Sequence, residues 1–197
     1  MKIQYTDTNR IKRICNHEAG HYIVARELLF ITHGIAVQFD PIQGHTGHAV
    51  IEPWTPNITS ITEISVYLER RIKVLFAGAI SEAMEVTGEF DADYACRDWK
   101  TGGSTNDHSK IRELVQTLRN IKYPQTTDEA AAQIELTKID KDLIQKTFEI
   151  VQNRIELIHE IGNMLFQKVK DYLVKYELLE TEINQVKRIR ELYIDKL

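Results

Sequence analysis

The five residues His17-Glu18-Ala19-Gly20-His21 constrain the fold more than any other stretch of this 197-residue chain. An α-helix turns by about 100° per residue, so histidines four positions apart lie one turn apart on nearly the same face. Two imidazoles at that spacing can bind one metal ion, and Glu18 beside them can reach a water molecule at the metal. The motif therefore has this chemistry only if a helix runs through all five residues.

The flanking sequence favours such a helix. No proline interrupts residues 8–31, and Thr6, Asp7 or Thr8 can cap the N-terminus. Apolar residues recur at helical spacing on both sides of the motif; they are Ile11, Ile14, Cys15, Ile23, Val24 and Leu28. The sequence thus places the motif in the middle of the helix.

Composition excludes several classes of protein. Hydrophobic residues make up 43% and charged residues 27%, as in ordinary globular proteins, and the net charge of −4 gives no argument for a nucleic-acid partner or an anionic membrane surface. We expect no membrane span, signal peptide or P-loop ATPase, because no long apolar run, apolar h-region or GxxxxGK[ST] occurs. Two cysteines, Cys15 and Cys96, without a CxxC motif, indicate a reducing, cytoplasmic location.

Residues 33–52 predict a β-hairpin. Ile35, Val37 and Phe39 alternate with smaller or polar residues, and residues 41–44 have the chemistry of a turn. Residues 45–52 then form a second, antiparallel strand.

The HExxH pattern on a helix predicts a zinc-dependent peptidase, and an exposed strand beside the metal site has an obvious use in such an enzyme. Its unpaired backbone groups can hold a substrate peptide in extended form. His45 and His48 could also reach the metal, but strand and turn histidines are more often solvated. The residues that we expect to line the substrate are Gly47, His48, Ala49 and Val50.

A strongly amphipathic helix begins at Thr59 or Ser60, and its apolar stripe continues through residues 77–80. Glu82 follows at the end of this small-residue stretch. It is either a solvated surface carboxylate or a hydrogen-bond partner that orients a metal-binding histidine.

The segment 87–104 is rich in glycine, aspartate and aromatic residues and predicts a long loop. Its possible metal donors are explained equally well by a solvated acidic loop; they are Asp91, Asp93, Cys96 and Asp98. A further helix opens at residues 101–107. Asp107 in its first turn either favours the helix dipole or reaches the metal as a distant ligand.

The remainder of the chain is helical in pattern throughout. We expect a short helix at 130–137, a long helix capped by Asp140, and a last short helix over about 180–192. His159 lies among the apolar residues of the long helix, where a packed or solvated histidine is favoured over a ligand. We divide the chain into a zinc-binding catalytic part, 1–122, and a helical part, 123–197, packed with it as one domain.

Four motifs occur in the order and approximate spacing of the FtsH peptidase domain. They are His17-Glu18-Ala19-Gly20-His21, Gly47-His48-Ala49-Val50, Leu75-Phe76-Ala77-Gly78-Ala79-Ile80-Ser81-Glu82 and Thr101-Gly102-Gly103-Ser104-Thr105-Asn106-Asp107. The chain resembles this zinc peptidase family over almost its whole length. The resemblance implies a mainly α fold with a small antiparallel β-hairpin or sheet near the active-site helix.

The resemblance also implies roles for the matching residues. His17, His21 and Asp107 would bind Zn²⁺, Glu18 would be the general base, and Glu82 would support a histidine ligand. The family's membrane anchor and AAA+ unfoldase have no counterpart in this sequence. Smaller departures are Ala77, Ala79 and Ala83 at family glycine, arginine and glutamate positions, and His108 in place of leucine, which either stabilises an oxyanion or is incidental.

These features together predict a zinc metalloendopeptidase that acts on a polypeptide substrate without its own unfoldase. One alternative is a non-catalytic, zinc-stabilised module that binds a partner. Such a site needs no general base and closes with a fourth protein ligand, here Cys96 or His108. Another is an adaptor that docks on a separate ATPase through its C-terminal helices. A homo-oligomer is left open.

Overall fold

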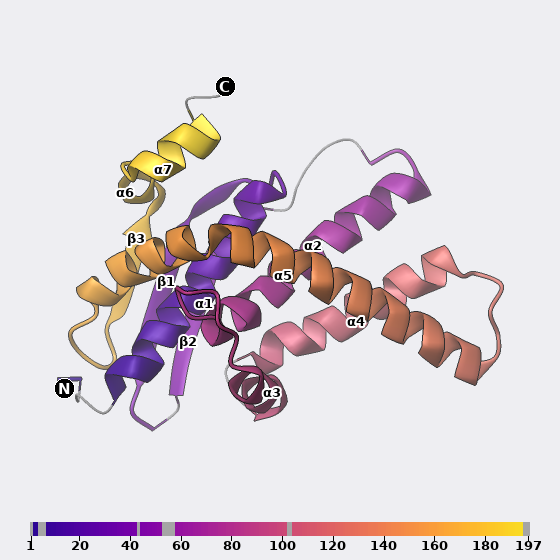
Figure 1. The fold of residues 1–197 in the computed structure, drawn as a ribbon, viewed down its shortest axis with the longest axis horizontal. Helices are drawn as coiled ribbons and strands as arrows, with labels where there is room; N and C mark the ends of the chain where they lie inside the picture. The colour runs from indigo at the N-terminus through magenta and orange to yellow at the C-terminus, as the bar shows by residue number, and fades with distance from the viewer. Residues whose placement is uncertain (1, 4–6, 43, 53–57, 102–103, 195–197) are drawn as a thin grey trace.

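The computed structural model describes residues 2–3, 7–42, 44–52, 58–101 and 104–194, with the backbone alone at 96 and 98–101. The fold is mainly helical with one small antiparallel sheet, which confirms the predicted class (Figure 1). Its elements in chain order are α1 (Thr8–Glu27), β1 (Thr32–Asp40), β2 (Gly44–Ile51), α2 (Ile61–Ala83), α3 (Ala92–Thr101), α4 (Thr105–Lys122), α5 (Glu129–Lys168), β3 (Lys175–Leu179), α6 (Glu180–Ile183), α7 (Lys187–Ile189) and the π-helical turn η2 (Arg190–Ile194).

The helix that carries the motif lies at the centre of the fold. Every residue from Ile14 to Ala25 is buried, because α2 and α5 pack against α1 from two sides (Figure 1). The crossing with α2 is close at Gly20, where a Cβ would lie 2.2 Å from Ser81 Oγ and 2.8 Å from the Ala77 carbonyl oxygen. A glycine inside a helix costs about 1 kcal/mol relative to alanine. Here it lets two helix backbones meet at the level of the two histidines.

The predicted hairpin is present and forms two strands of the sheet. The strand order is β2-β1-β3, with both neighbours antiparallel to β1, so Ala36 in the middle strand lies opposite His48 on one side and Glu177 on the other. In this sheet β2 is an edge strand.

The third strand corrects the prediction that residues 123–197 are helical throughout. Residues 175–179 pair with β1. Leu178 is buried, and Glu177 and Leu179 on either side of it are exposed. The alternation of Tyr176 and Leu178 is the local signal, but it covers too few residues to stand out beside the preceding long helix. The predicted last helix is also broken into α6, α7 and η2.

Two further helix boundaries differ from the prediction. Part of the expected loop 87–104 is the helix α3, which begins where the Asp91 side chain accepts a hydrogen bond from the Tyr94 N–H at 2.9 Å. The short and long helices expected around Asp140 are one continuous 40-residue helix, α5. Its cap is Asp128, which accepts from the Ala131 N–H at 2.7 Å, while Asp140 lies half-buried in the interior of the helix.

Long-range polar contacts tie the C-terminal elements to the central helix. The Arg26 guanidinium donates to the Asn184 side chain at 2.8 Å and pairs with Glu180 at 3.2 Å. Arg154 of α5 pairs with Glu27 at 2.6 Å. In the described parts of the chain no helix is long and apolar enough to cross a lipid bilayer.

Candidate metal centre

The two histidines of the motif face the same point, as the helical spacing predicts. His17 Nε2 and His21 Nε2 are 3.0 Å apart, and their rings meet edge to face with centroids 4.7 Å apart. Both residues are only 7% exposed. One turn of α1 therefore supplies two buried imidazole nitrogens to a single site.

Asp107 joins them from the first turn of α4. Its Oδ2 lies 3.0 Å from His21 Nε2 and 3.3 Å from His17 Nε2. Zinc–ligand bonds of about 2.0–2.1 Å at tetrahedral angles would place donor atoms about 3.3 Å apart. The three donors thus have the identity and the separations of a three-ligand metal site, and His17, His21 and Asp107 lie close enough together to bind one ion.

A glycine on α2 leaves the space that the donors need. A Cβ at Gly78 would lie 2.4 Å from His17 Nε2 and 2.5 Å from His21 Nε2. Any larger residue at this position would displace the nitrogens that face the site. Three helices therefore build the candidate metal site. The donors come from α1 and α4, and Gly78 of α2 leaves space for them.

Each histidine is held in orientation by its other ring nitrogen. His17 Nδ1 lies 2.8 Å from Glu82 Oε2, and His21 Nδ1 lies 2.7 Å from the Val74 carbonyl oxygen. If each Nδ1 carries the proton and donates it, both Nε2 atoms keep a lone pair for a metal. This contact favours the supporting role of Glu82 over a solvated carboxylate, since the residue is only 5% exposed.

Glu82 is itself held by residues that the sequence did not single out. The Tyr94 hydroxyl of α3 donates to Glu82 Oε1, and Arg13 of α1 stacks over the Tyr94 ring at 4.1 Å from its centroid. Arg13 also pairs with Asp91 at 3.5 Å. A chain of contacts therefore connects the first turns of α3 to the imidazole of His17.

The electrostatics follow from burial and from these pairs. Burial opposes ionisation of Asp107, but the two imidazoles outweigh it and hold the pKa of Asp107 well below its usual range. Burial likewise opposes ionisation of Glu82, and its hydrogen bond with His17 reverses the effect and lowers the pKa. For Glu18 burial prevails over the neighbouring histidines, and its pKa is raised.

Glu18 is a buried carboxylate that lines the same pocket as the donor residues. It is 5% exposed, and its Oε2 is buried without a hydrogen-bond partner among the described residues. Its Oε1 faces β2 so closely that a Cβ at Gly47 would lie 2.2 Å away. A carboxylate oxygen without a protein partner, beside two histidine nitrogens, is positioned for a water molecule or a substrate group.

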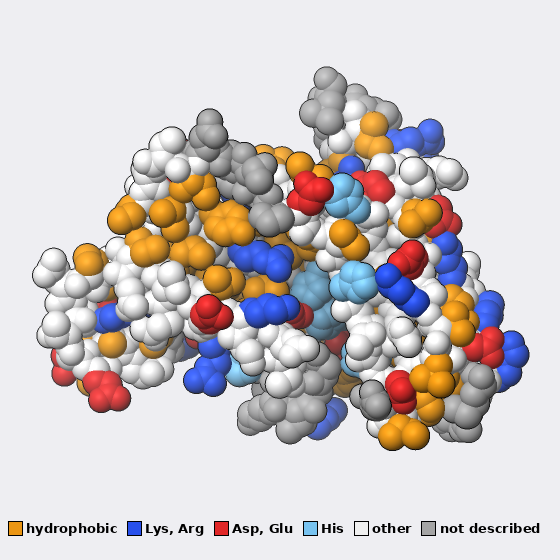
Figure 2. Space-filling view, turned by 180° about the vertical axis from the view of Figure 1, so that it is seen from behind, with side chains coloured by type: hydrophobic (Ala, Val, Ile, Leu, Met, Phe, Trp, Pro, Cys, Tyr) orange, Lys and Arg blue, Asp and Glu red, His pale blue; other side chains and the backbone are white. Residues whose placement is uncertain are grey.

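The site opens into a pocket of about 270 Å³. Its walls are β2 on one side and α2 and α4 on the other. Histidine side chains gather at this hollow in the middle of the face shown in Figure 2. The lining residues are His17, Glu18, His21, His45, Thr46, Gly47, His48, Ala49, Ile51, Arg71, Val74, Leu75, Asn106, Asp107 and Lys110.

The predicted substrate strand borders this pocket. Gly47, His48 and Ala49 line it, and Val50 is the next residue of β2, with 42% of its surface exposed. Because β2 is an edge strand, the arrangement has the geometry that strand addition requires.

The other predicted metal-ligand candidates do not belong to the donor cluster. His45 and His48 line the pocket, but the donor cluster within the described residues consists of His17, His21 and Asp107. His108 is not among the described residues lining the pocket, and burial and Arg112 lower its pKa.

His159 is a packed histidine, as expected, with Nε2 2.9 Å from the Met84 carbonyl oxygen. Cys15 is a free, buried thiol, and Asp91 caps α3. The side chains of Cys96 and Asp98 lie outside the described residues.

Neither protein-family models nor curated proteins give a match to this chain. The geometry of the site and the chemistry of its residues therefore carry the functional argument.

Proposed function

We propose that this chain is a zinc-dependent metalloendopeptidase that resembles the FtsH peptidase domain. The observation that carries the proposal is the convergence of His17, His21 and Asp107 with the buried, unpartnered Oε2 of Glu18 at the floor of one pocket. Two imidazoles and one carboxylate are a donor set that suits zinc, and three protein ligands leave a position open for catalysis. When bound, zinc would supply a Lewis acid and would lower the pKa of water towards neutrality.

The residues around the donors have distinct tasks in peptide hydrolysis. Glu18 accepts the proton of the attacking water and passes it to the amine that leaves. Glu82 and the Val74 carbonyl hold the two imidazoles in the orientation in which Nε2 faces the site. Burial of Glu18 raises its pKa, which suits a group that takes and returns a proton.

The edge strand gives the substrate a place to bind. A peptide paired in extended form with β2 would pass beside Gly47, where the Glu18 carboxylate touches the strand. The absence of a side chain at Gly47 leaves Glu18 room to approach the strand. Peptides and locally unfolded segments fit this geometry, since their backbone groups are free to pair with β2, whereas most backbone groups of a folded protein are already paired within it.

The test of the base is Glu18→Gln, with the exposed Glu160→Gln as the matched control. We expect Glu18→Gln to keep bound zinc, measured by elemental analysis, and to hydrolyse a labelled unfolded protein about 10²–10⁴-fold more slowly than wild type. Glu160→Gln should match wild type in both measurements. Full activity in Glu18→Gln would sink the mechanism.

The test of the third ligand is Asp107→Ala, with the exposed Asp93→Ala as control. We expect the first variant to lose most of its zinc and its activity and the second to keep both. Unchanged zinc content in Asp107→Ala would remove Asp107 from the site. Stoichiometric zinc in a wild-type protein that hydrolyses nothing would instead support the non-catalytic partner-binding alternative.

A further inference from the structure

The wall of the pocket opposite β2 carries two cations. Arg71 comes from α2 and Lys110 from α4, and both line the pocket together with the apolar side chains of Val74 and Leu75. Figure 2 shows Lys and Arg side chains beside the histidines of the hollow, next to a broad apolar surface. The catalytic steps above assign no task to either cation.

Arg71 shares the helix face that builds the metal site. Residues 71, 74, 78 and 82 are spaced by three or four, so their side chains follow one another along one side of α2. Arg71 precedes Gly78 by seven positions, which is about 10 Å along the helix axis. Arg71 therefore lies about two turns from the donor nitrogens, at the distance of a neighbouring substrate residue rather than of the scissile bond.

Lys110 is displaced from the metal site in the same direction. It follows Asp107 by one turn of α4, and its Nζ is 3.7 Å from Asp107 Oδ1. The helices α2 and α4 are antiparallel, since the last residue of α4, Lys122, pairs with Glu69 of α2 at 2.5 Å, while Asp107 lies beside the histidines at Gly78. Moving towards Lys110 on one helix is moving towards Arg71 on the other.

The guanidinium of Arg71 is available to bind an anionic group of a ligand. It is half-buried, and no hydrogen bond or ion pair joins it to another described residue. The pocket's two carboxylates, Glu18 and Asp107, are committed to the reaction and to the donor cluster. Within the pocket the two cations balance these carboxylates, so a bound divalent metal ion would leave the site with an excess of positive charge.

We propose that Arg71 and Lys110 form a carboxylate-binding subsite beside the metal centre, so that the preferred substrates carry an acidic side chain or a free C-terminal carboxylate near the cleaved bond. The planar guanidinium can bind a carboxylate with two hydrogen bonds, and Lys110 adds a second charge from the facing helix. The proposal rests on the proposed function and specifies its substrate class.

The experiment uses zinc-loaded protein and a synthetic library of 14-residue peptides, made with free and with amidated C-termini, whose cleavage products are identified by mass spectrometry. We expect Asp or Glu at one fixed position relative to the cleaved bond if the side chain is recognised. If the terminus is recognised, we expect cleavage near free C-termini that amidation abolishes. No enrichment of either carboxylate would overturn the subsite.

Variants then connect the preference to the two residues. Arg71→Ala should lower kcat/KM for the preferred peptides about tenfold or more and leave it unchanged for the same peptides with Asn, Gln or an amide in place of the carboxylate. Lys110→Ala should have a smaller effect in the same direction, and Arg71→Glu should favour lysine at the same position. An equal loss for all peptides in Arg71→Ala would contradict the proposal.

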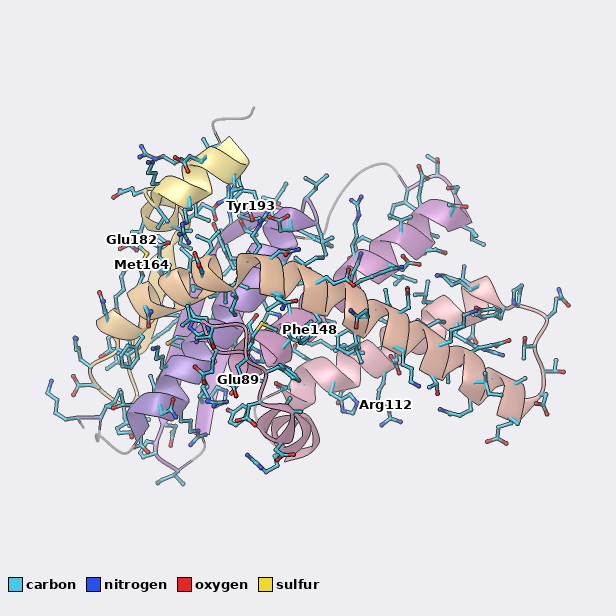
Figure 3. The ribbon with its side chains drawn as sticks, in the orientation of Figure 1. Glu89, Arg112, Phe148, Met164, Glu182 and Tyr193 are labelled. Carbon is cyan, nitrogen blue, oxygen red and sulfur yellow. The ribbon has the colours of Figure 1, made fainter. Side chains whose placement is uncertain are left out.

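The matched control is Arg112→Ala, which removes a cation from the same helix as Lys110. Arg112 faces the groove between α4 and α5 and is labelled in Figure 3. This variant should keep the wild-type preference, and the same loss of preference in it would also contradict the proposal.

A binding measurement separates this inference from the proposed function. Zinc-loaded Glu18→Gln is titrated calorimetrically with the acidic peptides and their neutral counterparts, with and without Arg71→Ala. We expect the acidic peptides to bind about tenfold more tightly and this difference to vanish with Arg71. Absence of hydrolysis would refute the peptidase, whereas equal binding of both peptides would refute the subsite.

Discussion

At the scale of single residues, the site depends on two glycines that leave room for its polar side chains. The donor nitrogens of His17 and His21 occupy the space where any side chain at position 78 would begin. Glu18 approaches β2 because position 47 also has no side chain. Glycine in a helix interior is ordinarily unfavourable. The close approach of the two histidine nitrogens explains why position 78 has a glycine.

Gly78→Ala separates helix propensity from metal binding. In an open helix this change stabilises by about 1 kcal/mol, but here the new Cβ would meet His17 Nε2 at 2.4 Å and His21 Nε2 at 2.5 Å. We expect the zinc dissociation constant, measured with a competing chelator, to rise about tenfold or more, with helix content by circular dichroism unchanged. Ser81→Ala on the same helix is the control and should bind zinc as wild type does; equal affinity in both variants would contradict the crowding argument.

At the scale of secondary-structure elements, α3 contacts the metal-site residues indirectly, through Glu82 of α2. Tyr94 reaches Glu82, and Glu82 reaches His17. Asp91 caps the N-terminus of α3 and also pairs with Arg13 of α1. The position of α3 is therefore coupled to the orientation of one imidazole.

Tyr94→Phe tests that coupling with the loss of one oxygen atom. The ring still packs under Arg13, but Glu82 loses a hydrogen bond and holds His17 less firmly. We expect zinc affinity to fall several-fold, less than the roughly 10–100-fold expected for Glu82→Ala, which removes the direct partner. Competition with a chelator measures both variants, and a Tyr94→Phe protein with wild-type affinity would show that α3 is not coupled to the site.

At the scale of the whole molecule, α5 joins the helices that build the candidate metal site to the C-terminal segment. It packs on α1 and α2, and its His159 lies against the Met84 carbonyl at the end of α2. Burial lowers the pKa of His159, and Lys12 nearby acts in the same direction, against the hydrogen bond to Met84. The folded protein therefore holds this histidine neutral at a pH where an exposed histidine would begin to take up a proton.

The pH dependence of unfolding follows from the sign of that shift. Below a pH of about 6.5 the unfolded chain binds a proton at His159 more readily than the folded chain does, so the contribution of His159 to the free energy of unfolding decreases as pH falls through this range. We therefore compare urea unfolding of the metal-free wild type and His159→Gln between pH 8 and pH 5.5, and expect the stability of wild type relative to the variant to decrease as pH falls. Identical slopes would mean that His159 titrates alike in both states.

Much of the site could be predicted from the sequence because its signals are local or tied to a motif. The helical spacing of His17 and His21 determines their common face, and the first-turn position of Asp107 and the hairpin around Gly47 were also expected. Other features depend on neighbours distant in the chain. Tyr94 stands in a stretch that reads as a loop, and Arg71 reads as an ordinary charge on an amphipathic helix.

The sequence by itself therefore determined which side chains the motif helix brings together: the helix periodicity puts two imidazoles and a carboxylate on α1, and alternation predicts the hairpin beside it. Only the tertiary structure decided how these parts meet. Asp107 is 90 positions from His17, and β3 pairs with a strand more than a hundred residues earlier. Contacts of that range are selected by packing across the whole core, which no local pattern of residues encodes.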